Sequence, residues 1–310
     1  MMANRIRELD FLKAVFIVLM VVFHLAYFSE LHPYLKRIVY TFHMPAFLII
    51  SGYLTNINRG AGPFFRGLMW IFIPYAIMEM GYVAACSVLP VSEAIDHLSV
   101  ALLLEKTLLG PLGPYWYLHT LIVCSALYFS VYKLLSAQSP IVRLLVLALG
   151  FYALSFGVIS WPNAMYFTFG LLLRQNGVAF LSFFRPSPLA LVPLVLLCTW
   201  GQNLDRATLA GVLIVYLVIS VLLWLYTLLG QTLRRPIEFL GRNTLVVLLF
   251  SPIFTILAKG LIPLLCFDPT GLCFMVLALG LTLGGCLLIG WVCDRLRISR
   301  FFFGRTEVLQ

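Results

Sequence analysis

Long apolar runs, separated by short polar segments, recur along the whole 310-residue chain. Most of them are close to the roughly 20 residues that an α-helix needs to cross a hydrocarbon core of ~30 Å. Backbone amides in such a core must be bonded internally, so we expect helices. The period-2 alternation that marks a membrane β-barrel is absent. The pattern predicts an all-α, polytopic membrane bundle that forms a single domain over residues 1–310.

Ten segments are predicted to span the membrane. They lie near residues 11–28, 37–55, 68–89, 115–135, 141–159, 162–173, 188–200, 208–229, 244–264 and 272–292. The sixth and seventh are short, so totals of nine to eleven also fit the pattern. No small-residue cleavage site follows the first run, and we expect that run to be retained rather than removed as a signal peptide.

Composition excludes a soluble enzyme domain. Hydrophobic residues make up 62% of the chain and charged residues 11%, whereas soluble domains carry about 25% charged residues. The seven cysteines are scattered, mostly inside apolar runs. They show no metal-ligand spacing, so we expect free thiols and no metal cofactor.

Basic residues predict the orientation of the bundle. One set of alternate inter-span segments holds 16 of the 21 lysines and arginines, which places that set, and both termini, in the cytoplasm. We therefore attribute the net charge of +9 to anchoring in the cell's inner (cytoplasmic) membrane, and expect the lipid bilayer but no nucleic acid as a partner. The sequence leaves the oligomeric state open.

The first span carries a polar stripe. Lys13 and His24 are eleven residues apart, which is three helical turns plus about 20°, so both side chains lie on one face, ~16 Å apart along the axis. Asp10 falls on nearly the same stripe. His43 enters the second span from the opposite side and reaches a depth similar to that of His24. Ionisable groups at such depth indicate a functional site.

Each of these residues also has a purely structural interpretation. Lys13 could be a lysine that extends to the membrane surface, and His43 could hydrogen-bond across a helix interface. That second interpretation is favoured for His119, and we expect His32 and His97 to be solvated in loops. The small residues Ser51 and Gly52 indicate close helix packing.

Several motifs resemble those of the acyltransferase-3 family of membrane acyltransferases, in the form found in its sugar O-acetyltransferase branch. The residues from Arg7 to His24 resemble its opening motif, in which ten residues separate a basic residue from a histidine; here the basic residue is Lys13. The segments FHMPAFLIISGYL (42–54), PYWYLHTLIV (114–123) and LGRNTLVVLLFSPIF (240–254) resemble later motifs. The chain departs from the family pattern at Trp70, Leu248 and Ser251.

The resemblance implies transfer of an acyl group, commonly acetyl from acetyl-CoA, to a hydroxyl of a sugar in an envelope glycan, exopolysaccharide or lipid-linked sugar. Phosphates of the acyl-CoA suit Lys13, Arg66 and Arg59 at the inner mouth of the bundle. His24 suits the role of general base, although an acyl-histidine intermediate is an open alternative.

The remaining assignments carry alternatives of their own. His43 would orient the acceptor or polarise the thioester carbonyl. Asp10 would position Lys13, or form a plain salt bridge with it. Trp116 would stack on a sugar, or belong to an aromatic belt at the membrane interface. The acyl group could also be succinyl.

Two other functions remain compatible with the sequence. The first is a transporter or flippase of a lipid-linked sugar or exopolysaccharide. A transporter of this kind typically has paired repeats with interrupted helices, and this chain shows no internal repeat, since all its histidines lie in the first half. The second is an inactive relative that serves as a structural partner, against which the intact Lys13, His24 and His43 argue.

Overall fold

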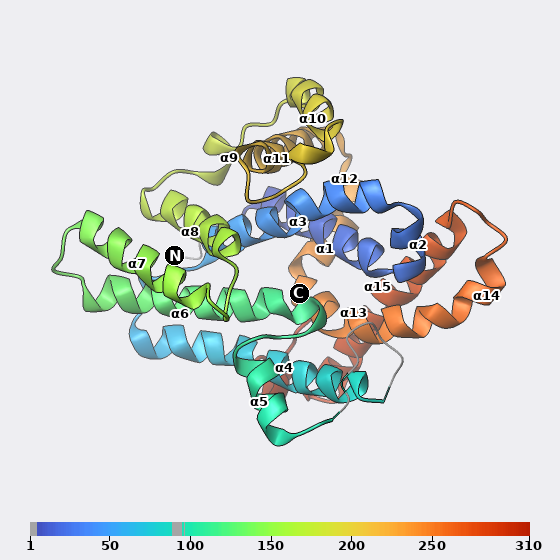
Figure 1. Cartoon of the computed structure of the whole chain (residues 1–310), viewed down its shortest axis with the longest axis horizontal. Coiled ribbons are helices and arrows are strands. Elements are labelled where there is room, and N and C mark those ends of the chain that lie inside the picture. The colour runs from blue at the N-terminus through green and yellow to red at the C-terminus, as the bar shows by residue number, and fades with distance from the viewer. Residues whose placement is uncertain (1–4, 89–94, 96) are drawn as a thin grey trace.

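The chain is seen in a computed structural model that describes residues 5–88, 95 and 97–310, and those residues form helices and no strands (Figure 1). The helices are α1 (Arg7–His24), α2 (Ala26–Leu31), α3 (Pro33–Leu54), α4 (Ala61–Cys86), α5 (Val100–Leu108), α6 (Trp116–Leu134), α7 (Pro140–Leu154), α8 (Trp161–Gln175), α9 (Phe180–Phe183), α10 (Leu191–Cys198), α11 (Leu209–Leu228), α12 (Gln231–Arg242), α13 (Thr244–Ala258), α14 (Ile262–Leu265), α15 (Leu272–Arg295) and α16 (Ser299–Phe302). The all-α prediction is confirmed.

Each of the ten predicted spans overlaps at least one helix, although residue 89 at the end of the third lies outside the described residues. The first, 11–28, covers α1 and part of α2, and the ninth, 244–264, covers α13 and part of α14. Within the described part of the chain, five helical stretches are long and apolar enough to cross a membrane. They are Ala61–Cys86, Gly113–Leu134, Leu209–Leu228, Thr244–Leu265 and Leu272–Arg295. The total of about ten crossings and their orientation therefore stay predictions.

Apolar surface on the outside of the bundle agrees with a membrane environment. In α15, only 22% of the most apolar stretch is buried inside the protein, and Val276, Leu288 and Trp291 are each more than half exposed. Contiguous apolar surface of this kind is rare on proteins that face water. The outward side chains of α15 are accounted for by contact with lipid.

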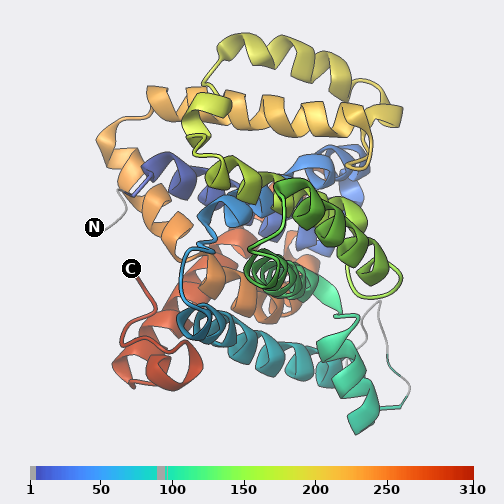
Figure 2. The ribbon, with the colours of Figure 1, turned by 90° about the vertical axis from the view of Figure 1, so that its left-hand side faces the viewer.

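The helices form layers around α1 and α3. In both views α10 and α11 lie along one side of the bundle, α1 and α3 lie in the middle, and α4 and α5 lie along the opposite side (Figures 1 and 2). Helix α1 packs against α3, α11, α12, α13 and α15. Its central position buries Asp10 and half-buries Lys13, whereas His24 at its C-terminal end stays exposed.

Helices α3 and α8 approach each other closely at two glycines. A Cβ atom at Gly52 would lie 2.0 Å from the carbonyl oxygen of Phe167, and one at Gly170 would lie 1.9 Å from that of Ile49. Only residues without a side chain permit such backbone contact. The prediction that Gly52 serves helix packing is confirmed.

Hydrogen bonds connect helix ends on each side of the bundle. Arg37 Nη2, near the start of α3, donates to the Gly201 carbonyl at 2.9 Å, and Arg174 Nη1, near the end of α8, donates to the Tyr53 carbonyl at 3.0 Å. Both bonds join ends that the alternation of spans places on the same side. The start of α1 and the end of the chain also lie on one side of the molecule (Figure 2).

Candidate active site

One cavity, here called the histidine cavity, lies at the C-terminal end of α1. Several of the residues that the sequence analysis identified line it. Its volume is about 530 Å³. The polar and aromatic residues that line it include His24, His43, Trp116, His119, Asn163 and Arg206. The structure thus places His24 and His43 in one cavity, as the sequence predicted, and Trp116 lines the same cavity.

His24 is the last residue of α1, and its ring is exposed to the space around it. Its Nδ1 lies 2.7 Å from the Met20 carbonyl oxygen. A carbonyl can only accept a hydrogen bond, so Nδ1 carries the proton and the lone pair of the neutral ring lies on Nε2. This is the tautomer that a general base at Nε2 requires. His24 also lines a neighbouring cavity of about 290 Å³, which reaches Ser251 and Lys259.

His43 has the same local geometry but is buried. Its Nδ1 lies 2.7 Å from the Val39 carbonyl oxygen, which again leaves Nε2 as the acceptor. Neither this Nε2 nor Oδ1 of the buried Asn163 has a hydrogen-bond partner among the described residues. Such atoms are rare in folded proteins and call for an explanation. Both residues line the histidine cavity, but the two acceptor atoms are enclosed by protein, so a hydroxyl of a ligand would reach them only after neighbouring side chains move.

Tyr40 lies between the two imidazoles, and the sequence analysis did not identify it. Its ring centroid is 6.3 Å from that of His24 and 5.2 Å from that of His43. Its hydroxyl donates to the Phe23 carbonyl at 3.2 Å. Tyr40 therefore connects α3 to the last turn of α1 and keeps both histidines at the same depth.

The other histidines agree only partly with the sequence interpretation. His119 Nε2 lies 2.9 Å from the Leu108 carbonyl oxygen, so it does bond to a neighbouring helix, and it also lines the histidine cavity. His97 is exposed, as expected. The expectation that His32 is solvated is wrong: it is half-buried, and its Nε2 lies 2.8 Å from the Thr270 carbonyl oxygen.

A second cavity, here called the lysine cavity, lies toward the other end of α1. Its volume is about 570 Å³, and its cationic lining residues are Lys13, Arg59 and Arg305. The predicted pairing of Lys13 and Arg59 in one site is therefore reproduced. Arg66, assigned to the same site, lies exposed near the start of α4 and outside this lining.

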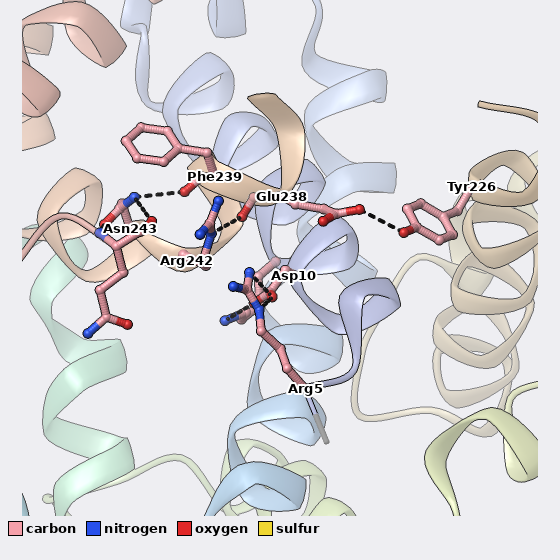
Figure 3. A network of polar contacts seen from close by, with 9 residues as sticks. Arg5, Asp10, Tyr226, Glu238, Phe239, Arg242 and Asn243 are labelled. Carbon is pink, nitrogen blue, oxygen red and sulfur yellow. Dashed lines mark hydrogen bonds and ion pairs between the residues drawn. The ribbon is translucent and has the colours of Figure 1, made fainter. Parts of the chain in front are cut away.

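Asp10 fixes the position of Lys13. Its carboxylate lies 2.8 Å from Lys13 Nζ and 2.5 Å from Arg5 Nη2 (Figure 3). Helix α12 supports this pair from behind, since a Cβ atom at Gly241 would lie 1.7 Å from the Asp10 carbonyl oxygen. The predicted salt bridge is present, and Arg5 is an additional member that the sequence did not reveal.

The C-terminal tail forms one wall of the lysine cavity. Gly304 has a φ of 66° and packs against the Trp70 ring, where a Cβ atom would lie 2.2 Å from Cδ2. The tail end is held by Asn243, whose Oδ1 accepts from Gln310 N at 3.0 Å (Figure 3). This contact places Arg305 in the lining, which no periodicity in the sequence could indicate.

The two cavities come close to each other along the bundle axis. On α6, Thr120 lines the histidine cavity and the next residue, Leu121, lines the lysine cavity. On α13, the corresponding residues are Leu248 and Leu245, ~4.5 Å apart along the helix. The partition between them is therefore about one helical turn thick.

Two rings and one hydrogen bond form part of this partition. Phe47 and Tyr117 pack edge to face with centroids 5.1 Å apart, and both are buried outside the two linings. The Tyr117 hydroxyl bonds to Ser51 Oγ, and Ser51 lines the lysine cavity. The described linings have no residue in common, so passage between the cavities requires these side chains to move.

One comparison with known proteins gives a match. The sequence model of a family described as an acyltransferase domain matches residues 6–291, which includes α1 and both cavities except the C-terminal tail. No similar protein of curated function and no similar solved structure was found for the chain.

Proposed function

The chain belongs to this acyltransferase family, and we propose that it moves an acetyl group from acetyl-CoA to a hydroxyl of an envelope or exopolysaccharide sugar. Family membership and the outward apolar helices make it a membrane acyltransferase. The donor, the acceptor and the residues that serve them are the proposal.

The observation that carries the proposal is that α1 contributes to both cavities. Lys13 lines one and His24 lines the other. An enzyme that receives its donor on one side of a membrane and its acceptor on the other needs two such spaces and a reactive group that both substrates can reach.

The lysine cavity suits the donor. Acyl-CoA is rich in phosphate, and Lys13, Arg59 and Arg305 present three cations to one space, only one of which is paired with an acid by a described contact. Charge-assisted bonds from lysine and arginine to phosphate are among the stronger hydrogen bonds in proteins. With the Lys13 end in the cytoplasm, the thioester would enter along the bundle axis and cross the partition at Tyr117.

The histidine cavity suits the acceptor. His24 Nε2 takes the proton of the sugar hydroxyl, and the oxygen forms a bond to the thioester carbonyl carbon. The carbon–sulfur bond then breaks, and the imidazolium returns its proton to the departing thiolate. His43 Nε2 and Asn163 Oδ1 would accept hydrogen bonds from other hydroxyls of the sugar. Trp116 would stack on its apolar face.

The test is mass analysis of envelope and secreted glycans from cells with the gene, without it, and with it restored. We expect one acyl group, 42 mass units for acetyl as a rough nominal value, to disappear and return. Unchanged acylation together with accumulation of a lipid-linked sugar on the inner side would refute acyl transfer and support the transporter instead.

A further inference from the structure

A third cavity, here called the aromatic groove, lies between α8 and α11 beside the histidine cavity. Its volume is about 580 Å³, within the ~300–1,000 Å³ of typical small-molecule sites. Six aromatic side chains line it, namely Trp161, Tyr166, Phe169, Phe183, Phe184 and Tyr216. Its lining extends along α8 from Trp161 to Phe169, a rise of ~12 Å, so it has room for the first part of a hydrocarbon chain.

The groove is open toward the outside of the bundle. Val212 and Leu213 of α11 are each 45% exposed, and both line it. In a membrane protein, an apolar opening on the outer surface faces lipid tails. An amphiphile dissolved in the bilayer could therefore enter the groove sideways, without passing through water.

Arg206 connects the groove with the histidine cavity, because the residue lines both. The guanidinium carbon lies 5.8 Å from the centroid of the Trp116 ring, which belongs to the histidine cavity. Its backbone carbonyl accepts from the hydroxyl of Tyr166, which belongs to the groove, at 2.7 Å. The arginine is thus positioned at the junction between an apolar channel and a polar chamber.

The charge of Arg206 has no acidic partner in the part of the chain that the structure describes. The adjacent Asp205 directs its carboxylate to the backbone amide of Ala207, at 2.9 Å. Burial lowers the pKa of Arg206 from its ordinary value, yet a guanidinium keeps its charge in proteins. Asp205 attracts the guanidinium without forming an ion pair with it in the described part of the chain, and a half-buried arginine that touches no acid favours an anionic ligand.

We propose that the acceptor is a sugar carried on a long-chain polyisoprenyl phosphate, with its hydrocarbon tail in the aromatic groove, its phosphate at Arg206 and its sugar in the histidine cavity. The proposal rests on the acyl-transfer function above and specifies its substrate. It follows from the order of three features: the apolar aromatic groove, then Arg206, which forms no ion pair among the described residues, and then the polar histidine cavity.

Ordinary phospholipid is the competing occupant, and the two differ in their requirements. Both carry a phosphate that Arg206 can bind, but a phospholipid has two acyl chains on a phosphodiester, whereas the proposed ligand has a single polyisoprenyl chain. The probe is therefore undecaprenyl phosphate that carries a diazirine, photolysed with the full-length protein in nanodiscs, with the labelled peptides identified by mass spectrometry. Competitors are undecaprenyl phosphate, undecaprenol without phosphate, and phosphatidylglycerol.

We expect label on α8 and α11, and competition by undecaprenyl phosphate at concentrations at least about tenfold below those of the alcohol, which lacks the charge-assisted contact. We expect a similar margin over phosphatidylglycerol, because its two acyl chains do not match a groove that takes one polyisoprenyl chain. Arg206→Gln should abolish the preference for phosphate over alcohol, and Arg206→Lys should retain most of it. Equal competition by phosphatidylglycerol, or an unchanged preference in Arg206→Gln, would overturn the proposal.

A second pair of variants tests whether the ligand's tail occupies the aromatic groove. Val212→Trp fills the groove and should reduce labelling at least about fivefold, a change of roughly 1 kcal/mol. Val276→Trp places the same side chain on the outward face of α15, where Val276 is 60% exposed, and should leave labelling unchanged. Equal labelling in both variants would also refute the groove.

The labelling experiment measures lipid binding and does not require acyl transfer. In His24→Ala, the label should persist although acyl transfer is lost. If the labelling behaves as expected but glycans keep their acyl groups when the gene is deleted, the acyltransferase assignment fails and the lipid site stands. If acylation is lost on deletion but the groove is not labelled, the enzyme assignment stands and this inference fails.

Discussion

The histidine cavity and the lysine cavity have similar volumes, about 530 and 570 Å³, but their chemistry differs. The first is lined by His43 and Asn163, each with a buried acceptor atom that no described residue satisfies, and by Arg206. The second has three cations and a buried carboxylate that holds one of them. A neutral, hydroxyl-rich ligand matches the first, and a phosphate-rich ligand matches the second. The two cavities are therefore alike in volume, and their polar side chains are what distinguishes the ligands that they suit.

The largest expected effect is on the rate of acyl transfer, and it concerns His24 in the histidine cavity. His24→Ala should reduce acyl transfer by about 10²–10⁴-fold, the usual contribution of a general base. Protein abundance should be nearly unchanged, because the side chain is exposed at a helix end. The measurement is acyl product formed by purified protein, with His97→Ala as control, since His97 is also exposed and lines neither cavity. Full activity in His24→Ala would remove His24 from the mechanism.

The next effect concerns donor affinity. Lys13→Ala should raise the KM for acyl-CoA by about 10- to 100-fold, equivalent to the ~1.5–3 kcal/mol of a hydrogen bond to a charged group. The KM for the acceptor should not change, because Lys13 does not line the histidine cavity. Lys133→Ala is the matched control, since Lys133 is exposed and lies outside the lysine cavity. A higher KM for the acceptor would contradict the division between the two cavities.

A smaller effect tests the partition. Tyr117→Phe keeps the ring and removes the hydrogen bond to Ser51, which lowers the cost of opening by about 1 kcal/mol. If the thioester crosses there, acyl delivery in a single turnover should become faster, by up to about fivefold. Thermal stability should fall slightly. Slower delivery with unchanged stability would show that Tyr117 contributes to the reaction in another way.

The smallest effect is on the KM for acyl-CoA in a variant of Arg66. It tests whether Arg66, assigned from the sequence, or Arg305, which lines the lysine cavity, binds the donor. Arg66→Ala should change the KM for acyl-CoA by less than about twofold, because exposed charges contribute ~0–1 kcal/mol and Arg66 lies outside the lysine cavity. Arg305→Gln, in the tail that lines this cavity, should change it by about tenfold or more. The reverse order of the two effects would restore the assignment made from the sequence.

Local patterns predicted the helices and the polar face of α1, because helical periodicity and span length are properties of neighbouring residues. They also predicted that His24 and His43 share a cavity, since both depths follow from where the spans begin and end. Arg206 and Arg305 were missed as site residues for a physical reason. Each reaches its cavity through contacts between segments that are far apart in the chain, Arg206 above Trp116 and the Arg305 segment against Trp70, and no periodicity records such contacts.

The glycine contact between α3 and α8 has a consequence for motion. Helix α3 carries His43 and α8 carries Asn163, and backbone atoms that touch at both Gly52 and Gly170 leave the two helices little freedom to slide or separate. The spacing of the two unmatched acceptors is thus set before any substrate arrives. If an acyl donor crosses the partition as proposed, we expect the opening to come from side-chain rotation or from movement of other helices such as α6 or α13, while α3 and α8 stay together.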